Sequence, residues 1–142
     1  MKTRKQYAAL PFIVTAGRTE VLLITSRESH RWIIPKGWPK KSLAAHKLAA
    51  LEAFEEAGIA GHVSKLPIGR FKYIKIHGNN SKSKCDVEVF GLEVDRQYLE
   101  WPEKGEREYR WMSVKKASGL VKEKELKKLL RSFRPNHLKK RR

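Results

Sequence analysis

The sequence predicts a single α/β domain, and three observations support this. At 142 residues the chain is long enough for one domain with a proper core and too short for two. Strand-like segments alternate with helix-like segments, and glycines and prolines separate them. The segment 43–57 is rich in alanine and leucine, without internal glycine or proline, and it carries three glutamates. We therefore expect this helix to be the centre of any chemistry.

The first part of the chain is expected to form three strands. Segments 8–16 and 21–25 are apolar, and the turn residues 17–19 between them indicate a hairpin. Residues 31–34 form a short apolar strand that ends before a proline. Two prolines and a glycine then predict an irregular loop at 35–39.

The helix at 43–57 has signals at both ends. Ser42 is a suitable N-cap residue, and Gly58 is suited to end the helix in the left-handed conformation. Leu48 and Phe54 are expected to face a core, together with Leu43 and Leu51. The three glutamates occupy a different sector of the helix.

Three further strands and a helical region are predicted beyond that helix. Residues 70–77 are β-like, 86–94 alternate in polarity and 109–113 form a short strand. Polar loops are expected at 78–84 and 101–108. The remaining elements are a helical segment, 114–130, broken near 118–119, and a basic tail, 135–142, which follows a domain of residues 1–134.

Glu52, Glu55 and Glu56 are spaced by three and four residues, so they share one helical face. No lysine or arginine lies three or four positions away, although the chain has 32 basic residues against 15 acidic ones. An ordinary solvated face would be expected to carry such a lysine. Carboxylates that repel one another until a divalent cation arrives suit Mg²⁺ or Mn²⁺. The cluster therefore predicts a metal site.

The order of strand, glycine loop and glutamate helix resembles the Nudix hydrolase family. The family signature is G-x5-E-x7-R-E-U-x-E-E-x-G-U, in which U is a bulky aliphatic residue. Six residues of this chain match it at the correct spacing: Gly37, Glu52, Glu55, Glu56, Gly58 and Ile59. The spacing makes this match more specific than a short acidic cluster would be.

The resemblance implies a Nudix-type α/β/α sandwich with a mixed central β-sheet. It also implies a metal-dependent pyrophosphohydrolase that cleaves a phosphoanhydride in a nucleoside diphosphate linked to another moiety. The Pro-Lys-Gly loop and the basic surface look most like the branch that acts on diphosphoinositol and diadenosine polyphosphates. By resemblance, the three glutamates bind Mg²⁺ or Mn²⁺ with the Gly37 carbonyl. A later glutamate completes the site or acts as base, and the candidates are Glu106 and Glu108, with Glu103 behind them.

The chain departs from the signature at three positions. Leu43 replaces the first glutamate, Leu51 the arginine and Ala53 an aliphatic residue. In the family that arginine helps to orient the glutamates, so its loss motivates an alternative: a non-catalytic module that senses a phosphorylated ligand. Because packed apolar groups can replace a polar pair without structural cost, a variant enzyme is the interpretation we prefer.

The residues around the glycine loop have alternative roles. Lys36 can contact substrate phosphate or be an ordinary surface lysine, and Trp38 can stack on a base or pack the loop against the core. A strand face can line a substrate groove or be a packed sheet face with a basic rim. The residues of this face are Phe71, Tyr73, Lys75 and His77.

Charge and cysteine content bound the partners and the compartment. A net charge of +17 attracts anions, and polyphosphorylated small molecules are the partners we expect. RNA is the alternative, with pyrophosphohydrolysis at its 5′ end and the tail as a tether. A single cysteine, Cys85, fits a cytoplasmic location. The apolar run 8–16 resembles a signal peptide only superficially, because Pro11 interrupts it, and no stretch is long enough for a membrane span.

Overall fold

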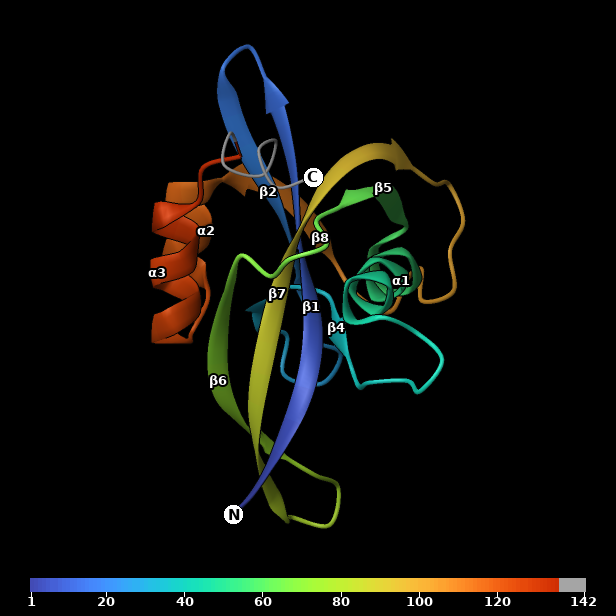
Figure 1. The fold of residues 1–142 in the computed structure, drawn as a ribbon, viewed down its shortest axis with the longest axis vertical. Coiled ribbons are helices and arrows are strands. Elements are labelled where there is room, and N and C mark those ends of the chain that lie inside the picture. The colour runs from blue at the N-terminus through green and yellow to red at the C-terminus, as the bar shows by residue number, and fades with distance from the viewer. Residues whose placement is uncertain (136–142) are drawn as a thin grey trace.

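The computed structural model describes residues 1–135, which fold into an eight-stranded mixed sheet with helices on both faces (Figure 1). The strands are β1 (Lys2–Thr15), β2 (Arg18–Thr25), β3 (Trp32–Ile33), β4 (Lys36–Gly37), β5 (Ile59–Val63), β6 (Gly69–Ile76), β7 (Lys82–Gln97) and β8 (Tyr109–Ser113). The helices are α1 (Ala45–Ala57), α2 (Val114–Leu120) and α3 (Lys124–Ser132).

The sheet is organised around its two long strands. β1 and β7 run parallel, with Lys2 opposite Ser83 and Phe12 opposite Glu93. The other pairings are antiparallel: β2 and β4 both pair with β1, and β5 and β6 both pair with β7. Since β4 pairs with β1 only at Tyr7 and Ala8, the glycine loop is held at the side of a central strand.

One hydrophobic core lies on each face of the sheet, as the predicted three-layer sandwich requires. On one face, Ala49, Ala53 and Ala57 of α1 pack against Phe90 and Leu92 of β7. On the other face, α2 and α3 cover the alternate residues of the same strand. The buried residues of that second layer include Val87, Val89, Ala117, Leu126, Leu129 and Leu130. Both faces of β7 are therefore buried in the body of the molecule.

Several predicted element boundaries are wrong. The helix begins at Ala45 instead of residue 43, and its N-cap is Ala44 instead of Ser42. A turn closed by Leu43 N–H to the Lys40 carbonyl, at 3.1 Å, precedes the helix. The break in the C-terminal helical region follows Leu120, because Gly119 is accommodated within α2.

Two strands were not predicted. β5 is short and half-exposed, and it contains a glycine, so nothing in its local pattern indicates a strand. β4 lies in the segment predicted to be an irregular loop. Both exist because a long neighbouring strand offers hydrogen-bonding partners, which is a tertiary effect.

The lower halves of β1, β6 and β7 extend beyond the helices as a three-stranded arm (Figure 1). We define the arm as residues 2–6, 72–76 and 82–86. It is rich in lysine and has Asp86 as its one acidic residue. The predicted strand 8–16 began too late because the polar first residues of β1 are held by pairing with β7. The predicted basic tail, from residue 136 onward, lies outside the described residues.

Candidate active site

The three glutamates of α1 lie at the edge of the face that packs on the sheet. Glu52 and Glu55 are half-buried, whereas Glu56 is only 7% exposed. Burial and the neighbouring Glu55 raise the pKa of Glu52 to about 7. Burial raises the pKa of Glu56 to about 8, and the positive charge of Arg107 opposes this rise. The helix thus gathers negative charge that it does not neutralise by itself.

Gly37 of β4 lies against Glu52, as the spacing of the signature requires. A Cβ atom at position 37 would lie 2.3 Å from Oε1 of Glu52. Any side chain here would displace the carboxylate, so the close approach needs glycine. The tyrosine opposite Gly37 in β1, Tyr7, fixes the loop in register.

The segment 98–108 is anchored on the C-terminal end of α1. Tyr98 N–H donates to the Gly58 carbonyl at 2.7 Å, and Glu103 N–H donates to the Glu55 carbonyl at 3.0 Å. Trp101 packs over Gly58, whose φ of 70° is the left-handed conformation predicted for it. These contacts fix the segment relative to the glutamates.

Arg107 brings a positive charge from this segment into the site, and the sequence analysis missed it. Its side chain is 9% exposed; Nη2 lies 3.1 Å from Glu103 Oε1 and 3.9 Å from Glu56 Oε1. Nη1 donates to the Thr25 carbonyl at 3.2 Å. The glutamates therefore do have a basic partner, which lies far away in the sequence and is invisible to helical spacing.

The three candidate bases have different surroundings. Glu106 pairs with Arg27 at 3.1 Å on the surface. Glu108 is exposed, and its main-chain N–H donates to Thr25 Oγ1. Only Glu103 is connected to the α1 glutamates, because Arg107 contacts both it and Glu56. Geometry thus favours the candidate that the sequence placed behind the other two.

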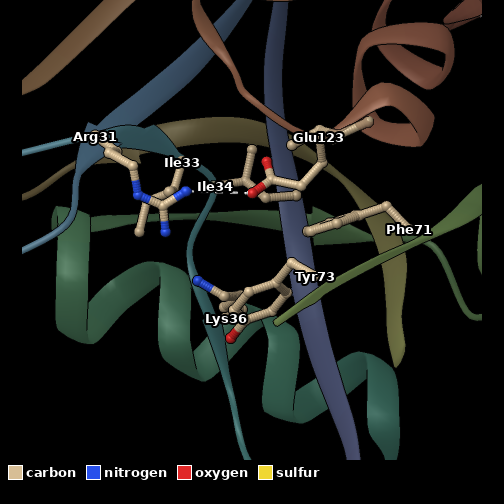
Figure 2. Close-up of a pocket in the computed structure, with 8 residues that line it drawn as sticks. Arg31, Ile33, Ile34, Lys36, Phe71, Tyr73 and Glu123 are labelled. Carbon is tan, nitrogen blue, oxygen red and sulfur yellow. Dashed lines mark ion pairs between the residues drawn. The ribbon is translucent and has the colours of Figure 1, made fainter. Parts of the chain in front are cut away.

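Lys36 lies on the opposite side of the glycine loop from Glu52. Its Nζ is 5.1 Å from the centre of the Tyr73 ring, and the two residues lie side by side in Figure 2, below the Arg31–Glu123 ion pair. Burial lowers the pKa of Lys36 to about 8; Glu56 opposes this change and Lys75 adds to it. Lys36 therefore interacts electrostatically with Glu56 and with Lys75 of the arm.

The aromatic residues near Lys36 pack instead of standing free. Trp38 is half-buried against the core, and the guanidinium of Arg4 lies 4.2 Å from its ring centre. On the predicted strand face, Phe71 is buried and the Tyr73 hydroxyl donates to Gln6 at 2.6 Å. Lys75 and His77 form the polar rim.

The donor set fits a divalent cation in its chemistry. Glu52, Glu55, Glu56 and the Gly37 carbonyl offer the oxygen ligands that Mg²⁺ and Mn²⁺ prefer. The raised pKa values of Glu52 and Glu56 reflect burial first and the neighbouring carboxylates second, and a bound cation would favour the charged forms. Within residues 1–135 no three acidic, histidine or cysteine side chains already converge as metal ligands. Binding therefore requires the glutamate side chains to rotate toward a common point.

Comparison with known proteins shows the family of this chain. The family model described as the NUDIX domain matches residues 4–136. The chain belongs to the Nudix family. Nudix hydrolase 12, mitochondrial, from Arabidopsis thaliana is 31% identical over 125 residues, covering 82% of this chain and 59% of the relative. Nudix hydrolase 13, mitochondrial, from the same plant is also 31% identical, over 82% of this chain and 60% of the relative.

Solved structures confirm the fold. A NUDIX hydrolase from Nitrosomonas europaea superposes with a TM-score of 0.67 and 14% identity, covering 99% of this chain and 92% of that one. The Ap4A hydrolase of C. elegans superposes with a TM-score of 0.63 and 18% identity, covering 91% and 94%. The chain spans about 59% of the length of the plant relative. No helix among the described residues is long and apolar enough to cross a membrane, and the cytoplasmic location stays a prediction.

Proposed function

We propose that this protein hydrolyses a phosphoanhydride bond in a polyphosphorylated small molecule, with Mg²⁺ or Mn²⁺ held by Glu52, Glu55, Glu56 and the Gly37 carbonyl. The observation that carries this proposal is the gathering of Glu52 and Glu56, with raised pKa values, against the glycine of the Nudix signature. When bound, the cation supplies charge neutralisation for phosphate oxygens and a more acidic water.

The residues around the glutamates have separate roles in this proposal. Lys36, half-buried and cationic below its pKa of about 8, binds a phosphate of the substrate. Glu103 is the candidate general base. Arg107 binds its Oε1, so Oε2 is the atom that can accept a proton from the attacking water. Arg107 holds Glu103 and Glu56 in position. It thereby replaces the arginine that the signature has at position 51, where this chain has a leucine.

Arg107 also bears on the sensor alternative. That alternative rested on the leucine at position 51, where the signature has an arginine. A buried arginine delivered by another segment supplies the missing cation, and this favours an enzyme.

The substrate class is supported by charge and by similarity. The positive charges of Lys36 and the nearby Lys75 suit ligands with several phosphates. The fold similarity to an Ap4A hydrolase makes diadenosine polyphosphates a reasonable first test, with diphosphoinositol polyphosphates and nucleoside diphosphates linked to another moiety beside them. An RNA 5′ end is the second candidate, and the basic arm is the observation that favours it.

A substrate panel with Mg²⁺ or Mn²⁺, scored for release of phosphate or mononucleotide, tests the proposal. The wild-type protein should turn over at least one of these four substrates. Glu56→Gln should lower kcat about 100-fold or more, because it removes a metal ligand. Glu103→Gln should lower kcat by about 100-fold, and Glu106→Gln, its matched control, by less than about threefold. Undiminished activity in Glu56→Gln would refute the assignment of the site.

A further inference from the structure

An open hollow of about 340 Å³ lies between the arm and the loop that joins β6 to β7, and it is lined by Lys2, Arg4, His77, Gly78, Asn79, Ser81 and Ser83. We propose that this hollow and the adjacent Lys75 form a binding groove for a chain of phosphate groups that extends away from the glutamates. We call it the arm groove and define it by Lys2, Arg4, Lys75, His77 and Ser83. The inference goes beyond the proposed hydrolysis, because it assigns a second, distal binding site.

Strand register places the groove cations on one face of the arm. Lys2 and Lys75 both lie opposite Ser83, so all three occupy one row across the sheet. Arg4 and Tyr73 both lie opposite Cys85 in the next row. Because side chains alternate along strands, rows that are two positions apart lie on the same face of the sheet. The cations of two strands, β1 and β6, therefore converge from both sides of β7.

Lys5, Lys72 and Lys84 belong to the opposite face of the same arm. Lys5 and Lys72 both lie opposite Asp86, and Lys84 lies one row further out. This face carries compensating acids: Arg70 forms ion pairs with Asp86 and Glu88. The groove face of the arm has no acidic residue of its own, since Asp86 lies on the opposite face. None of the lysines and arginines of either face of the arm makes an ion pair with a residue of the described range.

The groove offers neutral donors besides its cations. Two loop residues, Asn79 and Ser81, lie at its rim, where the Ser81 main-chain N–H donates to Asn79 Oδ1. His77 Nε2 and Ser83 Oγ are hydrogen-bonded to each other at 2.7 Å inside it. Uncompensated cations beside hydroxyl and imidazole groups are the partners that phosphate oxygens take.

Lys36 connects the arm groove with the glutamates. Its Nζ lies 5.1 Å from the centre of the Tyr73 ring, and Tyr73 shares a row with Arg4 opposite Cys85, so Lys36 lies beside the inner end of the groove. Arg4 bridges the same gap by stacking on Trp38, the residue after Gly37. A ligand that extends from Lys36 along this face would pass Arg4 and then Lys2 and Lys75.

The length of the path limits the ligand. Gly37 lies opposite Tyr7, five residues from Lys2 along β1, which is roughly 17 Å at the rise of a β-strand. A stacked nucleic-acid strand carries a phosphate every 3.4 Å, so about five phosphates cover this distance. A lone diphosphate is too short to reach both ends. Single-stranded RNA and inorganic polyphosphate share the required chemistry.

Binding measured in EDTA tests the groove independently of catalysis. The probes are a 5′-phosphorylated single-stranded RNA oligonucleotide and an inorganic polyphosphate, each titrated by fluorescence anisotropy or competition at several salt concentrations. The groove variant is Lys2→Gln, Arg4→Gln and Lys75→Gln combined. Its matched control removes the same charge from the other face of the arm: Lys5→Gln, Lys72→Gln and Lys84→Gln. Thermal unfolding verifies that both triple variants fold.

The groove variant should bind at least one probe about tenfold more weakly than wild type, and its salt dependence should fall by about two in log–log slope, since three phosphate contacts are lost. The control variant should lose less than about threefold. Preference for RNA or for polyphosphate identifies the source of the phosphates. Equal losses in both variants would show unspecific attraction to a basic surface and overturn the proposal, as would failure of wild type to bind either probe. Since no metal is present, absence of hydrolysis in the substrate panel would leave this result intact.

Discussion

The glutamate site and the arm groove carry opposite charges and are built in opposite ways. At the glutamate site, Glu56 and Arg107 are buried. Glu56 lies on a helix, and Arg107 lies on a segment that is hydrogen-bonded to that helix. In the arm groove, Lys2 and Arg4 are exposed on the first residues of β1, which no helix covers. Buried charged side chains are costly to displace, and their pKa values depend strongly on their neighbours. Exposed charged side chains act mainly through an electrostatic field that salt screens. Substitutions should therefore affect stability and turnover in the first region and salt-dependent affinity in the second.

The largest expected effect on stability comes from Arg107→Met. Removing one partner of a buried charge pair leaves Glu103 and Glu56 uncompensated, so the free energy of unfolding should fall by roughly 3 kcal/mol. Urea denaturation measures this. Arg27→Met is the matched control, because its ion pair with Glu106 is exposed and should contribute less than about 0.5 kcal/mol. Similar losses in the two variants would mean that burial does not distinguish these pairs.

A second test uses two glycines, one in each region. Gly37→Ala forces Glu52 to move, because the added Cβ would overlap its carboxylate. We expect kcat to fall about 100-fold for the best substrate of the panel, as displacement of a catalytic group by about 1 Å can cause. Gly78→Ala, at the arm groove, meets open space and should leave kcat and thermal stability unchanged. Normal turnover in Gly37→Ala would contradict the proposed position of Glu52.

A smaller effect is expected from pH. The carboxyls of Glu52 and Glu56 retain protons up to pH about 7 and 8 in the folded protein, against 4.5 for an ordinary glutamate. Between these values the folded state binds more protons than the unfolded state, so stability should fall as pH rises from 5 to 8. We expect a loss of roughly 2 kcal/mol, reduced by the partial exposure of Glu52.

Chemical denaturation across this pH range, without metal, checks the prediction. The double variant Glu52→Gln and Glu56→Gln should flatten the profile, while the arm-groove triple variant should keep it. Stability that rises from pH 5 to 8 in the wild-type protein would contradict the crowding of the carboxylates.

The difference between the two regions also explains what the sequence could predict. The glutamates, Gly37 and Gly58 follow local spacing rules, and the structure places Gly37 and Gly58 as expected. Arg107 could not be found in this way, because its contact with Glu56 depends on how residues 98–108 fold back on α1. Only part of the arm groove could be predicted. The sequence places Lys75 and His77 on one strand face, but Lys2 and Arg4 lie beside them because β1 pairs in parallel with β7. Long-range pairing also created β4 and β5, which carry no local signal.

Direct measurement of Mn²⁺ binding, by electron paramagnetic resonance of the free ion, tests the central claim that the α1 glutamates hold a divalent metal. The wild-type protein and the arm-groove triple variant should bind Mn²⁺ with the same affinity. Glu56→Gln should bind it at least about tenfold more weakly, because one charged oxygen ligand is lost. If wild type binds no Mn²⁺, or if Glu56→Gln binds it as tightly as wild type, the glutamates are not the metal site.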